Sequence, residues 1–524
     1  MTPTEIEQRL STVRRLLAAG ELGLAEELCR DFLQCIPADA RAWVLACDVA
    51  LKLRKWAPAT EFLSNATQLA PQDAELLIRY GYLLYRTGQM AGALRAASQA
   101  LVLHPKRADL ADSLGTLCTL LGDPEKGLGC FERAVTLAPG HSGFRYNLAM
   151  AERMCGHLER AEANLDQVIA VRPFDGEAYH ARSDLRRQTP ERNHIAQLEQ
   201  VLPRVAGHKA EFPVSFALAK ELDDVGEYAR SFGHLSKACR SYRASLRYDV
   251  ASDVAVLDKL TQSHRSAVLK RLQAPQGSEE PIFVLGLPRS GTTLVERILA
   301  GHSAVATAGE IDTFQRLAVA AVAERAGTRV GKLDFVDRLL ETDLDKLGAA
   351  YLAEARSRTG GASRFVDKFP ANYLYAGAIH AALPHARFVA LRRHPMDSCY
   401  AMYKTLFAAA YPFTYDLDDL GRYYVAWDRL VRHWEESLGA AWLSVSYESL
   451  VTTPDLVARQ ILTHCGLPWE ESCLQIHARS QPVMTASAVQ VRQPITTRSV
   501  GQWRRHAEQL RPLLEFFQAH QIAV

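Results

Sequence analysis

A glycine- and hydroxyl-rich segment near the middle of the chain has the residue types of a phosphate-binding loop. The apolar run 282–285 leads into Gly-Leu-Pro-Arg-Ser-Gly-Thr-Thr at 286–293, and an amphipathic stretch follows. A strand, a glycine loop and a helix in this order bind one anion well, because backbone N–H groups and the helix N-terminus point at it. The candidate ligand-binding residues of the loop are Arg289, Ser290, Gly291, Thr292 and Thr293.

The loop departs at one position from the loop that binds nucleoside triphosphates. In the pattern G-x-x-x-x-G-K-[ST] that begins at Gly286, the lysine position holds Thr292. That lysine contacts the β- and γ-phosphates in P-loop enzymes, so this loop suits a single 5′-phosphate group better than a magnesium triphosphate. A P-loop kinase or NTPase that uses ATP is kept as an alternative function.

Four further side chains follow short apolar runs. Glu310, Lys368, Arg393 and Tyr447 each stand at or just after the end of an expected strand. A carboxylate at such a position beside the loop can take the proton of a hydroxyl nucleophile. The competing interpretations are a surface or helix-capping glutamate and an ordinary exposed lysine.

The segment LPRSGTTL resembles the 5′-phosphosulfate loop of the sulfotransferases. It is similar to that of the tyrosylprotein sulfotransferases and their repeat-fused bacterial relatives, and the resemblance covers roughly residues 280–505. It implies 3′-phosphoadenosine-5′-phosphosulfate as the cosubstrate, transfer of a sulfuryl group to a hydroxyl, and no metal. Glu310 is then the catalytic base, Lys368 neutralises charge on the departing phosphate, and Arg289 acts with them.

The same resemblance implies a 3′-phosphate site. An R-x-P-x-D stretch begins at Arg393 and opens a helix, and the arginine and the helix N-terminus would hold the phosphate. The serine that the family carries eight residues later is Ala401 here, and Ser398 is the candidate substitute. The family's V-x-Y-E-x-L and late basic segments add two more contacts. The implied cofactor contacts outside the loop are Arg393, Ser398, Tyr447 and Arg492.

The first half of the chain has a period of 34 residues. Prolines recur at this interval from Pro37 to Pro173, and the residue 17 positions before each proline is a glycine except at Arg54. A glycine ends one helix and a proline stops the next, so each unit is expected to be a helix–turn–helix. The pattern resembles the tetratricopeptide repeat, with about five units over residues 4–187.

The predicted fold is therefore α + α/β. An N-terminal α-solenoid of tetratricopeptide repeats (4–187) precedes a helical extension with a degenerate repeat and a linker (188–275). A P-loop-like α/β sulfotransferase domain with a mostly parallel sheet (280–524) follows. We expect the array to bind a protein or peptide acceptor on its concave face. A structural scaffold and a homodimerisation surface are the alternatives.

The overall composition excludes several other partners. The 524 residues carry 61 basic and 59 acidic side chains, so nothing points to nucleic acid or a membrane surface. No signal-peptide core, membrane-spanning stretch or C-x-x-C pair occurs, and we expect a cytoplasmic protein with reduced thiols.

The resemblance implies protein tyrosine as acceptor, and a sugar, a lipid or a small phenol stays open. A non-enzymatic repeat adaptor with a decayed domain is a second alternative, although the catalytic candidates are intact.

Overall fold

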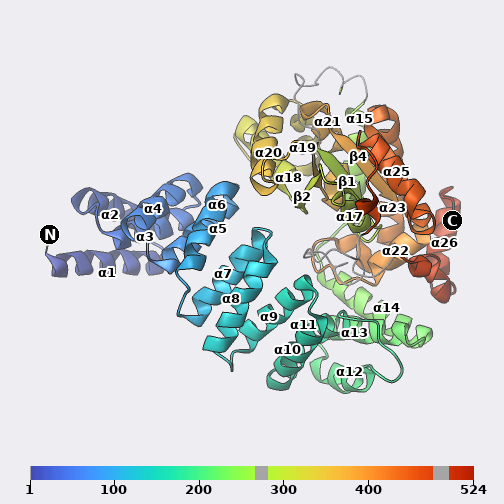
Figure 1. Ribbon diagram of the computed structural model, residues 1–524, viewed down its shortest axis with the longest axis horizontal. Coiled ribbons are helices and arrows are strands. Elements are labelled where there is room, and N and C mark those ends of the chain that lie inside the picture. The colour runs from blue at the N-terminus through green and yellow to red at the C-terminus, as the bar shows by residue number, and fades with distance from the viewer. Residues whose placement is uncertain (1, 266–268, 270–280, 476–494) are drawn as a thin grey trace. The chain divides into compact units, whose positions relative to one another are not determined.

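The computed structural model describes residues 2–265, 269, 281–475 and 495–524 of the chain. Contacts within the chain divide it into two compact units, Met1–Ala151 and Glu152–Val524. The first unit is helical, and the second holds further helices and the sheet (Figure 1).

The first unit is a row of helix pairs (Figure 1). The two helices of a pair pack against each other, and each pair spans one 34-residue period of the sequence, which confirms the expected repeat array. The helices are α1 (Pro3–Ala19), α2 (Leu22–Cys35), α3 (Ala40–Lys52), α4 (Trp56–Leu69), α5 (Ala74–Arg86), α6 (Met90–Val102), α7 (Ala108–Leu120), α8 (Pro124–Leu137) and α9 (Ser142–Cys155), which continues into the second unit.

The turn inside each pair is made by a residue in the left-handed conformation. Gly20 and Gly88 have φ of 79° and 77°, where a side chain would be strained. Arg54 occupies the same column with φ of 58°, and its turn closes with the same hydrogen bond, from Lys55 N to Ala50 O at 2.8 Å. Arg54 therefore strains the backbone at one residue, and the hydrogen bond that closes the turn is unchanged.

The second unit begins with helices of the extension. They are α10 (Leu158–Val171), α11 (Gly176–Ser183), α12 (Ile195–Val201), the 3-10 helix η1 (Leu202–Val205), α13 (Glu211–Asp224), α14 (Tyr228–Ser245) and α15 (Val250–Ser263). Phe216 and Phe232, on α13 and α14, are buried in the same apolar core as Tyr403 and Tyr415 of the α/β domain. The boundaries near residues 187 and 280 remain predictions from the sequence, whereas in the structure the extension and the α/β domain share one core.

The α/β domain is built on a five-stranded sheet in the order β2-β3-β1-β4-β5. All neighbouring strands are parallel, as the sequence predicted. The strands are β1 (Ile282–Gly286), β2 (Ala306–Gly309), β3 (Phe365–Asp367), β4 (Arg387–Arg392) and β5 (Trp442–Ser446). Parallel strands place their carboxyl ends at one edge, and a ligand crevice is expected there.

Helices cover both faces of the sheet, because side chains along each strand alternate between two apolar cores. Phe283 and Leu285 of β1 point into one core, whereas Ile282 and Val284 point into the other. The first core is closed by α18 (Thr313–Ala326), α19 (Lys332–Leu339), α20 (Leu344–Arg358), α21 (Ala376–Ala382), α22 (Pro395–Tyr403), α23 (Leu417–Leu438) and α26 (Arg511–Ala519), and the second by α17 (Thr292–Leu299), α24 (Tyr447–Thr452) and α25 (Pro454–His464).

No helix within the described ranges is both long and apolar enough to cross a membrane. The ten cysteines all lie among the described residues and are free thiols.

Candidate functional site

The glycine loop connects β1 to α17, as predicted, and two of its glycines are required by close neighbours. A Cβ on Gly286 would lie 2.8 Å from Leu391 O in the adjacent strand β4. A Cβ on Gly291 would lie 2.6 Å from the Tyr447 ring, and its φ of 106° is also unfavourable for other residues. The loop is therefore held between β4 and Tyr447, which places this predicted contact residue directly against it.

Two buried polar atoms beside the loop have no hydrogen-bond partner among the described residues. Ser290 is 1% exposed and Arg393 is 9% exposed. Among the residues that the structure describes, none offers a hydrogen bond to Ser290 Oγ or to Arg393 Nε. A buried donor left in this state costs about 1–3 kcal/mol, and a bound phosphate oxygen at each atom would satisfy it. These residues therefore fit a phosphate group.

Arg393 is nevertheless firmly placed. Its Nη1 donates to Arg289 O at 3.0 Å, its Nη2 donates to Ser499 O at 2.5 Å, and its guanidinium lies 4.8 Å from the centre of the Tyr447 ring. The predicted 5′-phosphate loop and the predicted 3′-phosphate arginine are thus adjacent, with Tyr447 contacting both.

The start of α22 is fixed by acidic side chains that accept backbone hydrogen bonds. His394 N donates to Glu448 Oε1 at 2.9 Å. Gly501 N and Trp503 N donate to Asp397 at 2.5 and 3.1 Å, so the C-terminal segment is tied to this helix. Ser398 is 2% exposed on α22, and its role as a cofactor contact stays a prediction. Arg492 lies outside the described residues.

A cation that the sequence reasoning missed belongs to the same region. Burial lowers the pKa of Lys404, and the charges of Arg289 and Arg393 lower it further, against the opposite effect of Asp223. Its Nζ lies 3.6 Å from Asp223 of α13 and donates to Gln502 Oε1 at 3.0 Å. No motif marks Lys404 in the sequence, because its position depends on α22 and on the distant helix α13. Three cations therefore gather where the phosphates are expected.

The other predicted pair lies at the ends of β2 and β3. Lys368 Nζ contacts the Glu310 carboxylate in an ion pair, and the hydrogen bond from Lys368 N to Gly309 O at 3.0 Å joins the two strand ends. The Lys368 side chain is 1% exposed, whereas that of Glu310 is 42% exposed. The alternative of an exposed lysine is wrong, and Glu310 is the carboxylate that an incoming molecule can reach.

A second carboxylate, also missed by the sequence, lies near Lys368. Glu296 of α17 has its Oε2 3.8 Å from Lys368 Nζ, and it accepts a hydrogen bond from Thr307 Oγ1 at 2.8 Å. Burial raises the pKa of Glu296, and the charge of Glu310 contributes in the same direction. In the sequence Glu296 looks like a polar residue on an amphipathic helix, since only the fold places it beside β2 and β3.

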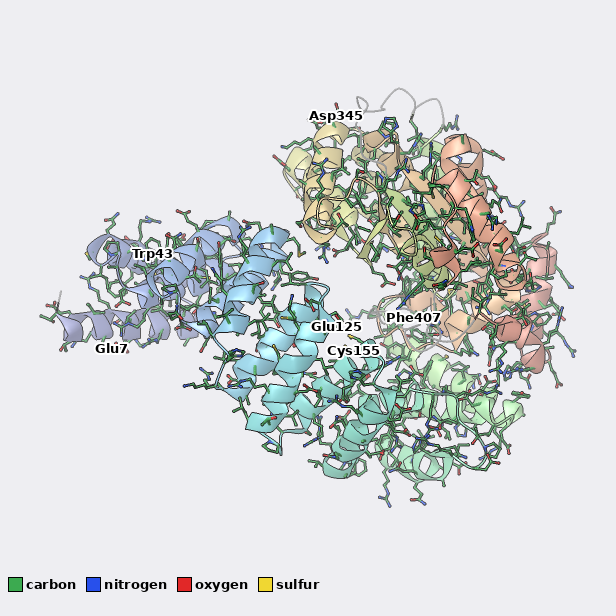
Figure 2. The ribbon with its side chains drawn as sticks, in the orientation of Figure 1. Glu7, Trp43, Glu125, Cys155, Asp345 and Phe407 are labelled. Atoms are coloured by element: carbon green, nitrogen blue, oxygen red, sulfur yellow. The ribbon has the colours of Figure 1, made fainter. Side chains whose placement is uncertain are left out.

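Aromatic side chains form part of the same region. Burial raises the pKa of Tyr411 to about 12, and the charge of Glu310 adds to this shift, so the phenol lies within electrostatic reach of the carboxylate. Phe407, labelled in Figure 2, packs against Tyr411 with ring centres 5.0 Å apart. Tyr423 is instead buried in the core, and its hydroxyl lies 2.8 Å from that of Tyr373. Tyr424 and Trp427 are core residues as well.

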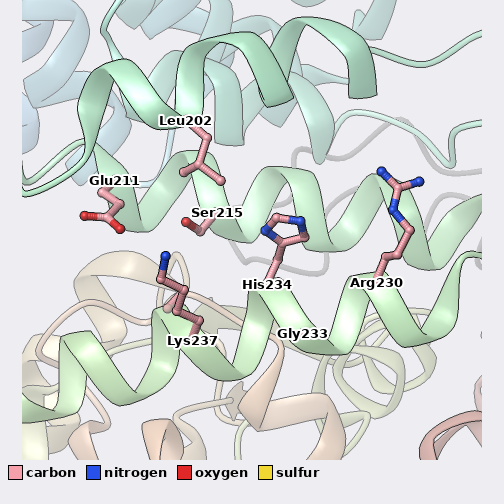
Figure 3. Close-up of a pocket in the computed structure, with 8 residues that line it drawn as sticks. Leu202, Glu211, Ser215, Arg230, Gly233, His234 and Lys237 are labelled. Carbon is pink, nitrogen blue, oxygen red and sulfur yellow. The ribbon is translucent and has the colours of Figure 1, made fainter.

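A separate cleft of about 350 Å³ lies in the extension (Figure 3). Figure 3 shows Arg230, His234 and Lys237 in a row along α14. Arg230 forms ion pairs with Glu199 and Glu227, so its charge is compensated within the protein. The lining residues are Leu202, Glu211, Ser215, Arg230, Gly233, His234, Lys237 and Ala238, and they include none of the predicted site residues.

Comparisons with known proteins match the α/β domain to a sequence family. The sequence model described as "Sulfotransferase family" matches residues 281–471. An uncharacterised protein of Aquifex aeolicus is 28% identical over 96% of this chain and 68% of its own length. Protein-tyrosine sulfotransferase 1 of Danio rerio is 26% identical over 42% of this chain, and protein-tyrosine sulfotransferase 2 of Gallus gallus is 24% identical over 43%. The chain spans 65% and 63% of these two relatives, less than two thirds of their length.

Solved structures match the helical part. The tetratricopeptide-repeat protein YrrB is 21% identical over 33% of this chain and 89% of its own, with a TM-score of 0.29. PilF of Pseudomonas aeruginosa is 16% identical over 43% of this chain and 95% of its own, with a TM-score of 0.31. The chain thus carries a sulfotransferase-family domain behind a region of helix pairs like tetratricopeptide repeats.

Proposed function

We propose that this sulfotransferase-family domain moves a sulfuryl group from 3′-phosphoadenosine-5′-phosphosulfate to a hydroxyl acceptor. One observation carries the proposal. The accessible carboxylate of Glu310 and the buried ammonium of Lys368 lie at the same sheet edge as two buried atoms without a hydrogen-bond partner among the described residues, Ser290 Oγ and Arg393 Nε. An acid–base pair beside an anion site is what transfer from an anionic donor to a hydroxyl requires.

Two groups of residues would hold the cosubstrate. The loop N–H groups, with Arg289, would bind the 5′-phosphate, together with the hydroxyls of Ser290, Thr292 and Thr293. Arg393 and the N-terminus of α22 would bind the 3′-phosphate, with Ser398 and Tyr447 as further contacts. When bound, the cosubstrate supplies an activated sulfuryl group on its 5′-phosphate. Burial lowers the pKa of Arg289, and the nearby charge of Arg393 lowers it further, so bound phosphate would relieve repulsion between the two cations.

The chain's own residues then perform the proton and charge steps. Glu310 takes the proton of the acceptor hydroxyl as the new oxygen–sulfur bond forms and the bond from sulfur to the 5′-phosphate oxygen breaks. Lys368 neutralises the charge that the 5′-phosphate gains. The products are a sulfate ester and adenosine 3′,5′-bisphosphate. The motif requires no metal for these steps.

Protein tyrosine is the acceptor that we favour. The similarity to two protein-tyrosine sulfotransferases supports it, as does the position of Phe407 and Tyr411, which provide aromatic surface near Glu310. A peptide held by the helix pairs would gain effective concentration at the base. A sugar, lipid or small phenol acceptor is the alternative, and a tyrosine peptide compared with each of these in a radiolabelled phosphosulfate assay distinguishes them.

Nucleotide binding tests the donor half of the proposal. Adenosine 3′,5′-bisphosphate at 100 times its Kd should stabilise the protein by about 2.7 kcal/mol, and ATP with magnesium should do much less. Thermal unfolding with each ligand measures the difference. Stabilisation by ATP and magnesium alone would favour the P-loop kinase alternative, and stabilisation by neither would favour the non-enzymatic adaptor.

A further inference from the structure

Lys368 lies near two carboxylates that differ in their exposure and in their distance from its ammonium. Glu310 follows β2 and is 42% exposed, whereas Glu296 lies on α17 and is 13% exposed. Glu310 contacts Lys368 Nζ directly, and Glu296 stands 3.8 Å away. The Glu310 carboxylate is therefore the more accessible of the two to an acceptor molecule.

The proposed reaction makes conflicting demands on this lysine. The Lys368 ammonium stabilises the ionised form of Glu310 and occupies one of its lone pairs, so the contact makes Glu310 a weaker base. The contact must therefore loosen when Glu310 receives a proton. Lys368 must at the same moment remain directed at the departing phosphate. A long flexible side chain that is released from its partner would lose this orientation. A second partner on a rigid element resolves the conflict.

Glu296 has the properties of that partner. It accepts the Thr307 hydroxyl at 2.8 Å, which fixes its carboxylate between α17 and β2. The helix that carries Glu296, α17, follows the phosphate loop directly. A contact with Glu296 therefore fixes the position of Lys368 relative to the loop that would hold the donor. The pairing of β2 with β3 shifts register between Thr307 and Gly309, and Glu310 follows this irregular strand end.

We propose that Glu296 is a positioning residue that holds the Lys368 ammonium at the donor while Glu310 receives the acceptor proton. The inference rests on the proposed sulfuryl transfer. Glu296 itself is no second base, because it is buried and its carboxylate is already engaged by Thr307 and Lys368. The charged groups that face Glu296 are Lys368, Glu310, Asp367 and Arg297, and burial raises its pKa, so removing its carboxylate should also change the pH profile.

A kinetic cycle tests the role. Glu296→Gln should lower kcat on a tyrosine peptide by roughly tenfold to a hundredfold, the range for one charge-assisted hydrogen bond, with the Kd of adenosine 3′,5′-bisphosphate within about threefold. The same substitution in a Lys368→Ala background should change kcat by less than about twofold, because residues that act as a unit are not additive. A loss of equal size in both backgrounds would overturn the proposal.

A second readout does not depend on turnover. In a Glu310→Gln background, acetylation of Lys368 by acetic anhydride, followed by mass spectrometry, reports how firmly the lysine is held. Adding Glu296→Gln should speed this labelling by about tenfold, as expected when a buried lysine loses a charged partner. Unchanged labelling would show that Glu296 does not hold the lysine. If the wild-type protein neither bound the nucleotide nor transferred sulfate, the proposed function would fail while the labelling still decided the position of Lys368.

Glu354→Gln is a matched control. Glu354 also holds a threonine hydroxyl, that of Thr313 at 2.9 Å, and a cation, Arg316, but it lies on α20 away from Lys368. The control should leave kcat, nucleotide affinity and Lys368 labelling close to those of the parent. A loss in Glu354→Gln as large as in Glu296→Gln would mean that general destabilisation, and not positioning, explains the effect.

Discussion

Replacing Arg393 by alanine should weaken the binding of adenosine 3′,5′-bisphosphate and leave that of adenosine 5′-monophosphate nearly unchanged. The two terminal nitrogens of Arg393 already donate to Arg289 O and Ser499 O, whereas its buried Nε has no partner among the described residues. A 3′-phosphate would add one charge-assisted hydrogen bond there, worth about 1.5–3 kcal/mol, so Kd should rise roughly tenfold to a hundredfold.

Calorimetry with both nucleotides measures this difference. Arg393→Lys keeps the positive charge but loses Nε and the planar fork, so it should fall between wild type and alanine. Arg392→Ala is the matched control, because the neighbouring guanidinium faces α23, where it pairs with Asp428 and lies over Trp427. Thermal unfolding of each variant without ligand separates a change in stability from a change in the site.

The comparison between ligands makes the prediction refutable. Arg393 also supports the loop through Arg289 O, so a distorted loop would weaken the binding of both nucleotides. Equal losses for the two nucleotides would therefore refute Arg393 as the 3′-phosphate residue. A loss in Arg392→Ala that matched Arg393→Ala would show that only the summed positive charge matters.

Four further outcomes are expected. Arg289→Ala should weaken adenosine 3′,5′-bisphosphate binding by about 1.5–3 kcal/mol by calorimetry, and an unchanged Kd would remove the loop from the site. Glu310→Gln should lower turnover by roughly 10²–10⁴ with nucleotide affinity within a few-fold, and retained activity would mean that another group is the base. Arg54→Gly should raise the free energy of unfolding by about 0.5–1 kcal/mol, because φ of 58° strains a side chain, and denaturant unfolding measures it. A chain beginning at residue 141 should bind the nucleotide normally but lose catalytic efficiency more on a protein acceptor than on a small phenol, and equal losses would refute acceptor docking on the repeats.

Features that depend on local sequence could be predicted. The 34-residue period fixes helix pairs, because glycine and proline act within one turn of their own positions. The glycine loop was found for the same reason, since strand, loop and helix are contiguous. The sequence also marked Glu310 and Lys368 as strand-end residues, and the structure brings them into contact.

Features that depend on the meeting of distant segments could not be predicted. Glu296 becomes a partner of Lys368 only after α17 packs beside β2 and β3. Lys404 joins the cations only because the end of α22 meets α13, which places its ammonium 3.6 Å from Asp223. Ser398 shows the opposite case, since its position on α22 was predicted while its contact with a phosphate stays a prediction.

The extension belongs to the same compact unit as the α/β domain, although its sequence resembles the repeats. Asp223 of α13 accepts a hydrogen bond from His506 at 3.2 Å, and the same imidazole nitrogen lies 2.7 Å from the Tyr400 hydroxyl of α22. The buried His506 therefore joins the extension, the C-terminal segment and the helix whose N-terminus would hold the 3′-phosphate.

Asp184, just beyond α11, also contributes to the electrostatic surroundings of Arg289. A cut near residue 188, where the repeat ends in the sequence, would remove Asp184 from the donor site and expose the core face of α13. This is why a chain that begins at residue 141, before α9, is the appropriate test of whether the repeats serve the acceptor alone.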